Sequence, residues 1–335
     1  MSVLAGAKVQ RRTSGLSDKA RKRIEITILS LPALIMFLGF VILPVFMAGY
    51  YGFFKWKGYG KPTVNGQFIG FENYKIILTD PNFQQALGHT LFVVVASLVI
   101  QGPLAILFAL LLNQRFKGRA LIRTLIFVPY VVSEVIVGTG WGLILQTTGA
   151  LNALLKKIGL GGADWISDPK IAIWTLMFII SWKYIGFAVI LMIAGMQSIP
   201  EDLYEAAKVD GAGFWRQQWS ITLPLLGPTI RIWAFMSIIG SLQLFDLVYI
   251  IWGQYVSSTA GTSTMATYMV REGRLANNYG YGSAVAVVIF IISLVIALTY
   301  QRFVLNRALE GALTDEKDAN RRAKRAESEA AKLAK

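Results

Sequence analysis

Six long apolar stretches limit what this chain can fold into. A helix that crosses a bilayer needs about 20 predominantly apolar residues. Hydrophobic residues make up 55% of the chain and charged residues only 16%, which is a low charge content for a soluble protein. The sequence therefore predicts an all-α membrane protein with six membrane-spanning helices. The apolar stretches occupy approximately residues 26–53, 90–112, 121–145, 171–196, 223–252 and 281–300.

Basic residues predict the orientation of these helices. Residues 1–25 form a basic tail, and the short loop between the second and third stretches contains Lys and Arg but no acidic residue. Cytoplasmic loops are enriched in Lys and Arg, so both segments are expected inside. Six spans then place both termini in the cytoplasm. The expected organisation is a cytoplasmic tail (1–25), a multi-pass membrane domain (26–301) and a charged cytoplasmic tail (302–335).

The charge and motif content also narrows the function classes. The formal net charge is +14, but the basic residues cluster beside apolar runs, which membrane topology explains better than a phosphate-binding face. We therefore expect no nucleic-acid partner. The chain has no cysteine, no HExxH zinc motif and no GxxxxGK[ST] phosphate loop. We expect no catalytic residues, no metal and no cofactor.

Residues 198–228 form the only long polar segment between two apolar spans in the second half of the chain. Ser198 and Glu201 have the spacing of a capping box, and Pro200 suits the first turn of a helix. The sequence predicts a helix that ends at Val209, because Gly211 tolerates the positive φ of a helix C-terminus.

One face of this predicted helix is mostly small. Leu203, Ala206 and Ala207 lie at positions i, i+3 and i+4, so they share a face that another surface could approach closely. Glu205 and Asp210 remain for polar partners. Considered one by one, these residues could equally belong to an ordinary amphipathic connector between two membrane helices.

The spacing of three short motifs is more specific than any of them alone. They are Glu205-Ala206-Ala207, Asp210-Gly211-Ala212 and Ile221-Thr222-Leu223-Pro224. Together they resemble the EAA loop in permease subunits of binding-protein-dependent carbohydrate ABC importers of the maltose and oligosaccharide type. The chain departs from this pattern at Gln218, where the family usually has an aromatic residue, and we expect the neighbouring Trp219 to occupy that space.

The resemblance implies a fold, a function and partners. The fold is a bundle of six membrane helices with a cytoplasmic coupling helix, in the cytoplasmic membrane. The function is to form the pathway for a sugar or oligosaccharide that an extracellular solute-binding protein delivers. A separate ATPase dimer hydrolyses ATP, and a second permease subunit, often a paralogue, completes the pore. The residues implied in ATPase coupling are Glu205, Ala206, Ala207, Asp210, Gly211, Ala212, Leu223 and Pro224.

Five residues within the spans are candidates for the substrate pathway. A sugar binds through aromatic faces and fixed hydrogen-bond partners. Trp182 and Tyr184 on the fourth span, and Gln243 and Asp246 on the fifth, are of these types. Glu134 is expected near the middle of the third span, where it could line the pathway, contact another subunit or make a buried structural hydrogen bond. Helix packing or interfacial anchoring explains the other four equally well.

Two other function classes are compatible with six membrane spans. An ion-coupled secondary transporter would need an ion or proton site, which Glu134 or Asp246 could supply, and would work without an ATPase. A membrane-embedded enzyme would need a catalytic set, and none occurs at a known motif spacing. An ATPase that copurifies with this chain would distinguish the importer from both.

Overall fold

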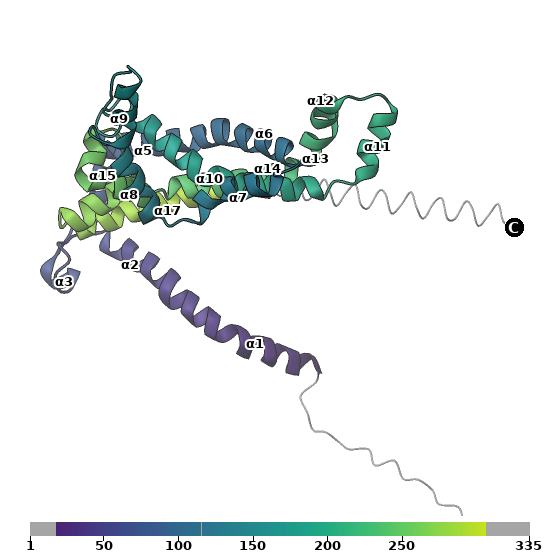
Figure 1. Ribbon diagram of the computed structural model, residues 1–335. Helices are drawn as coiled ribbons and strands as arrows, with labels where there is room; N and C mark the ends of the chain where they lie inside the picture. The colour runs from purple at the N-terminus through teal and green to yellow at the C-terminus, as the bar shows by residue number, and fades with distance from the viewer. Residues whose placement is uncertain (1–17, 115, 306–335) are drawn as a thin grey trace, which may run out of the picture. The chain divides into compact units, whose positions relative to one another are not determined.

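The computed structural model of the chain describes residues 18–114 and 116–305 (Figure 1). The described residues are almost entirely helical. They belong to two units that divide between Tyr50 and Tyr51. The first unit contains one helical stretch, and the second contains the bundle that carries the candidate site.

The first unit is a helix with one π-helical turn. Helix α1 (Asp18–Phe37) continues through η1 (Leu38–Ile42) into α2 (Leu43–Tyr51). Pro44 lies two residues after the end of the π turn. Because proline has no backbone N–H, it cannot donate to the preceding turn, and a π turn is one way for a helix to accommodate this. The stretch Lys22–Tyr51 is long and apolar enough to cross a bilayer.

The second unit begins with a small polar subdomain. Strand β1 (Phe54–Lys55) pairs antiparallel with β2 (Gln67–Phe68), and α3 (Pro62–Asn65) lies between them in the sequence. Helix α4 (Glu72–Thr79) follows. The buried Asn73 side chain donates to the carbonyl oxygens of Gly52 (2.9 Å) and Phe54 (3.1 Å), which ties α4 to the hairpin.

The membrane bundle consists of the helices that follow. Its elements are α5 (Pro81–Ala96), η2 (Ser97–Gln101), α6 (Gly102–Leu112), α7 (Arg119–Val131), α8 (Glu134–Ile144), α10 (Ala172–Gln197), α14 (Gly227–Leu242), α15 (Asp246–Thr259), α17 (Tyr279–Tyr300) and η5 (Gln301–Leu305). The connecting elements are α9 (Ala150–Lys157), α11 (Glu201–Val209), α12 (Phe214–Gln217), η3 (Gln218–Thr222), α13 (Leu223–Leu225), α16 (Met265–Val270) and η4 (Arg271–Leu275).

The third span is broken, which corrects the prediction of one helix over residues 121–145. Helices α7 and α8 meet at an angle of 97°. Val132 and Ser133 are extended (ψ 138° and 150°), and the Ser133 side chain accepts a hydrogen bond from the N–H of Ile136 to start the second helix. Glu134 is therefore the first residue of α8 and not the middle of a continuous helix.

The other spans are longer than the minimum needed to cross a bilayer and are predominantly apolar. Within the described residues, five helical stretches are long and apolar enough to cross a membrane, and the bent pair α7–α8 would be the sixth. The second stretch stays continuous from Pro81 to Leu112 through the π turn η2. The fifth of the six predicted spans contains a short break at residues 243–245, between α14 and α15.

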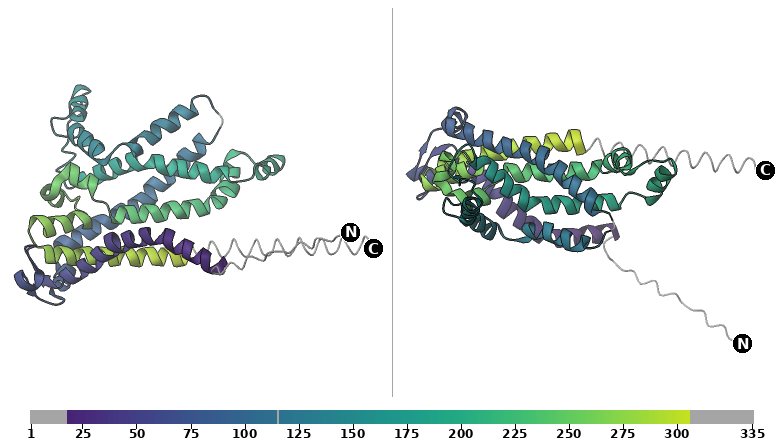
Figure 2. Two further views of the ribbon diagram at one scale, coloured as in Figure 1. Left: turned by 90° about the horizontal axis from the view of Figure 1, so that it is seen from below. Right: turned by 45° about the horizontal axis from the view of Figure 1, so that its top comes forward.

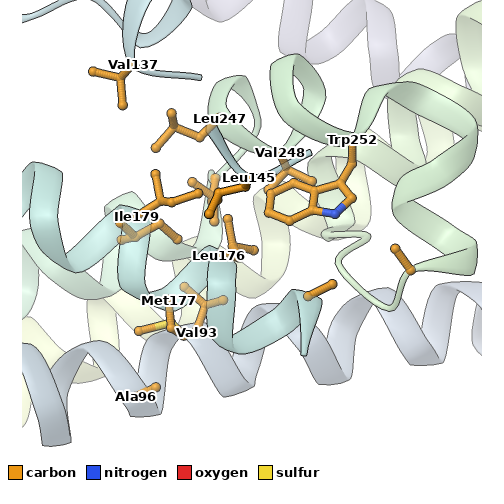
Figure 3. Packing of buried hydrophobic residues seen from close by; sticks show 14 residues of the cluster. Val93, Ala96, Val137, Leu145, Leu176, Met177, Ile179, Leu247, Val248 and Trp252 are labelled. Carbon is orange, nitrogen blue, oxygen red and sulfur yellow. The ribbon is translucent and has the colours of Figure 1, made fainter. Parts of the chain in front are cut away.

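Helix α10 is the centre of the bundle. It contributes to two of the clusters of buried apolar residues, one shared with α5, α8 and α15 and the other with α6 and α14. Figure 3 shows the first cluster, in which Leu176 and Ile179 of α10 meet Leu247 and Trp252 of α15. A third cluster joins α17 to α5, α14 and α16. By contrast, many large apolar side chains on the outer faces of the spans are exposed, as a lipid-facing surface requires.

The connecting elements lie at two opposite ends of the bundle. Helices α11, α12 and α13 project from one end, and α9 lies at the other (Figures 1 and 2). Helix α9 is the short helix that follows the third span. This separation is the one expected if the two segments are on opposite sides of a membrane.

Gly186 allows the closest approach between two helices. A Cβ atom on Gly186 would lie 2.1 Å from the carbonyl oxygen of Ile126 in α7, and backbone cannot move away as a side-chain tip can. We expect Gly186→Ala to destabilise the chain by about 1–3 kcal/mol through overpacking. The measurement is the thermal unfolding temperature in detergent, followed by tryptophan fluorescence.

Gly140 of α8 provides the matched control. A Cβ atom there meets nothing within 4 Å, so Gly140→Ala should be neutral or gain up to about 1 kcal/mol in helix propensity. Equal unfolding temperatures for the two variants would contradict the close packing of α7 on α10.

Candidate functional site

The polar segment after α10 begins differently from the prediction. Ser198 ends α10, and its hydroxyl donates back to the carbonyl oxygen of Gly195 (2.7 Å). Helix α11 begins at Glu201 after Pro200, with no side-chain cap. The predicted capping box is therefore wrong, because the Ser198 backbone is still helical and its side chain turns toward the helix that it closes.

The predicted end of this helix is confirmed. Helix α11 ends at Val209, and Gly211 adopts a left-handed conformation with φ of 74°. The N–H groups of Gly211 and Ala212 donate to the carbonyl oxygens of Lys208 and Ala207, so the last turn of the helix is satisfied. This closure reverses the chain direction within a few residues.

Helix α11 presents most of the predicted coupling residues to its surroundings. Glu205, Ala206, Asp210 and Gly211 are exposed, whereas Ala207 is half-buried. The other predicted residues lie nearer the bundle: Ala212 and Leu223 are half-buried, and Pro224 is exposed. Because α11 projects from the end of the bundle (Figure 1), a partner could reach its exposed side without moving the membrane helices.

A chain of polar side chains ties α11 to the start of the next span. The Thr222 hydroxyl donates to Oε1 of Gln218 (2.8 Å), and the Tyr204 hydroxyl lies 2.9 Å from the Thr222 hydroxyl. Since Thr222 has only one hydrogen to donate, Tyr204 is the donor in the second bond. Both Gln218 and Thr222 are buried.

This arrangement explains the departure from the family pattern at Gln218. A hydrogen-bonded glutamine fills the buried position, and Trp219 is 69% exposed. The expectation that Trp219 occupies that space is therefore wrong. The sequence analysis named Thr222 only as part of a motif and did not predict its contact with Tyr204, because a Tyr and a Thr eighteen residues apart carry no periodic signal.

A cavity of about 220 Å³ lies between α5–η2, α7, α10 and α14. Its aromatic lining is Tyr130, Tyr184, Phe187 and Trp233, and its polar lining is Ser97, Gln101, Ser237 and Ser241. The rings of Tyr130 and Phe187 stack with centroids 5.0 Å apart. The cavity therefore combines aromatic faces with hydrogen-bonding groups inside an apolar bundle.

Gln101 is a buried amide with unused hydrogen-bonding capacity. The Ser97 hydroxyl donates to its Oε1 (2.7 Å), and the Ser237 hydroxyl lies 2.7 Å from that of Ser97. Gln101 is only 3% exposed, yet among the residues that the structure describes its Nε2 has no hydrogen-bond partner. A buried unsatisfied amide is costly, so a ligand or water that accepts from this nitrogen would be favoured.

The structure brings only some of the predicted pathway residues together. Tyr184 lines the cavity, and its hydroxyl donates to the Glu134 carboxylate (2.7 Å). Trp182 lies on another side of α10, where it is partly exposed and packs edge-on against Trp141. Gln243 and Asp246 are exposed at the break between α14 and α15.

Of the residues that line the cavity, only Tyr184 was in the predicted set for the pathway. Gln101 and Ser237 are polar residues within apolar spans, which is a usable signal in the sequence. Tyr130 and Phe187 are aromatic residues in aromatic-rich spans, and only the packing of α7 on α10 distinguishes them from lipid-facing side chains.

The comparisons with known proteins agree with this fold. Residues 101–311 match the family described as "Binding-protein-dependent transport system inner membrane component". The trehalose/maltose transport system permease protein MalF of Thermococcus litoralis is 31% identical over 274 residues, which cover 81% of this chain and 90% of that protein. The sulfoquinovosyl glycerol transport system permease protein SmoG of Agrobacterium fabrum is 32% identical, and the match covers 84% and 91% of the two chains.

A solved structure shows the same architecture. One chain in the crystal structure of a bacterial alginate ABC transporter, in complex with an alginate pentasaccharide-bound periplasmic protein, aligns with a TM-score of 0.74. It is 27% identical, and the alignment covers 85% of this chain and 95% of that chain. The predicted all-α permease fold is thus confirmed. The chain belongs to the family of inner membrane components of binding-protein-dependent transport systems, and is a multi-pass membrane protein.

Proposed function

We propose that this chain is a permease subunit of an ABC importer for a sugar or oligosaccharide. An extracellular solute-binding protein would deliver the solute, a separate ATPase dimer would supply the energy, and a second permease subunit would complete the pore. The observation that carries the proposal is α11: a projecting helix with an exposed Glu205-Ala206 face and a glycine-closed end. The names of the related proteins support a carbohydrate as the solute.

The proposed orientation puts α11 in the cytoplasm with both termini. Arg123 at the start of α7 and Gln197 at the end of α10 line the same groove, so the basic loop before α7 and the start of the polar segment are at one end of the bundle. Lys117 belongs to that loop, and Arg119 begins α7. Cytoplasmic enrichment in basic residues then assigns this end to the inside.

The contacts around α11 suggest how force would reach the cavity. Helix α11 follows α10 after a short turn, and the Tyr204–Thr222–Gln218 bonds connect it to η3, which leads into α14. Helices α10 and α14 both line the cavity. Movement of α11 by a closing ATPase would therefore tilt two walls of the cavity together, as alternating access requires.

The cavity would be this subunit's part of the substrate pathway. Small-molecule pockets generally measure about 300–1,000 Å³. The cavity here, about 220 Å³, is smaller. A second subunit would thus have to complete a path wide enough for an oligosaccharide. The stacked rings of Tyr130 and Phe187 would contact the C–H faces of the sugar, and Gln101 would donate to a hydroxyl oxygen.

The secondary-transporter alternative has less support. Oε1 of Glu134, one of its two candidate ion sites, already lies 3.4 Å from the Lys183 ammonium and accepts from Tyr184, although within the described residues the buried Oε2 has no hydrogen-bond partner. Asp246, the other candidate, is exposed at the break between α14 and α15. Neither residue lines the cavity.

Affinity purification from native membranes tests the partners. We expect tagged protein to copurify with an ATPase and a second six-span protein, identified by mass spectrometry. A solute-binding protein in the eluate could be screened with sugars to identify the substrate. A chain that purifies alone as a stable monomer or homodimer would contradict the importer assignment.

Substitutions in α11 and its closing turn test the coupling. We expect Glu205→Lys, Ala207→Trp and Gly211→Pro to uncouple ATP hydrolysis from uptake without preventing membrane insertion. The milder Gly211→Ala should cost about 1–2 kcal/mol, because an L-residue is strained at this φ. Gly213→Ala is its control, since Gly213 has φ of −68° and open space around it. Normal uptake in the first three variants would refute the coupling role.

The cavity makes a separate prediction. Gln101→Leu keeps the size of the side chain and removes its amide, so we expect uptake by the reconstituted transporter to fall about threefold to tenfold. Gln301→Leu changes an exposed glutamine in η5 and should leave uptake unchanged. Equal uptake in both variants would exclude Gln101 from the pathway.

A further inference from the structure

Lys183 is a fully buried lysine inside a membrane span. Only 2% of it is exposed, and a charge at such a place is costly unless it is paired. Its ammonium group lies 2.7 Å from the carbonyl oxygen of Val132, 3.4 Å from that of Pro129 and 3.4 Å from Oε1 of Glu134. Two of the ammonium's three N–H donors therefore have carbonyl acceptors, and the Glu134 carboxylate supplies the opposite charge.

The three acceptors surround the bend between α7 and α8. The last carbonyl groups of a helix have no partner within the helix, and the C-terminus attracts a cation. Lys183 supplies both a donor and a positive charge to the end of α7. Glu134 is in the first turn of α8, where the helix dipole favours an anion. One lysine of α10 therefore satisfies the end of one helix and pairs with the start of the next.

The same carboxylate also holds a residue of the cavity wall. Oε1 of Glu134 accepts the Tyr184 hydroxyl at 2.7 Å, and Tyr184 lines the cavity. Tyr130, near the end of α7, lies edge-on to the Tyr184 ring with centroids 6.2 Å apart. The position of both rings thus depends on the groups that bind Lys183.

The bend joins two tightly packed helix pairs. Helix α7 lies along α10, with Gly186 against the Ile126 backbone, and α8 lies along α15, with Gly138 against the Ile250 side chain. In the sequence, only residues 132 and 133 lie between α7 of the first pair and α8 of the second pair. Any rotation of one pair against the other would have to change the angle at this joint.

We infer that Lys183 is a positioning residue that fixes the angle between α7 and α8 and, through Glu134, the orientation of Tyr184 in the cavity wall. The first part concerns the fold alone, and the consequence for transport rests on the proposed function. The hydropathy pattern of the sequence does not indicate this role for Lys183.

Spin-label distances test the joint directly. The chain contains no cysteine, so Leu121→Cys on α7 and Leu143→Cys on α8 would carry the only labels on it; both positions are exposed. In the purified transporter we expect a narrow distance distribution that broadens with Lys183→Met. Lys183→Arg keeps the charge and donors and should restore a narrow distribution. An unchanged distribution in Lys183→Met would overturn the inference.

Uptake by the reconstituted transporter tests the link to Tyr184 with variants that preserve side-chain size. We expect Glu134→Met and Tyr184→Phe each to lower uptake up to about tenfold, and the double variant to be no worse than the lower single variant, because the Tyr184–Glu134 hydrogen bond is lost in all three. Effects that multiply in the double variant would overturn the link. If the wild-type complex takes up no sugar but the distance result holds, the proposed function fails and the role of Lys183 in the joint stands.

Discussion

Backbone groups inside a bilayer must find hydrogen-bond partners within the protein, because the hydrocarbon offers none. This bundle interrupts a span between α7 and α8, where Val132 and Ser133 are extended. The ammonium group of Lys183 donates to carbonyl oxygens at the end of α7, and the Ser133 side chain caps the start of α8. The sharp bend is tolerated because α10 supplies the missing donor.

The central position of α10 connects the parts of the protein that the proposed transport cycle would use. Its buried face packs on α5, α6, α7 and α14. It carries Lys183 at the bend, Tyr184 and Phe187 at the cavity, and Ser198 at the turn into α11. A displacement at the α11 end would therefore be transmitted along one continuous 26-residue helix.

Polar side chains in the bundle differ in whether their hydrogen-bonding groups have partners. Tyr204, Thr222 and Gln218 bond to one another and hold the base of α11. Gln101 is different, because its buried Nε2 lacks a partner in the described part of the chain and borders a cavity. The first set is suited to transmitting movement, and the second to a ligand that accepts a hydrogen bond.

The sequence by itself determined the all-α membrane fold, the family and the helix that ends at Val209. Apolar runs must be helical in a bilayer, and the spacing from Glu205 to Pro224 is local, so both can be read without tertiary contacts. Only the tertiary structure decided the bend before Glu134 and which side chains share the cavity. Each of these depends on partners far apart in the sequence, such as Lys183 with Val132 or Ser97 with Ser237, and hydropathy carries no information about them.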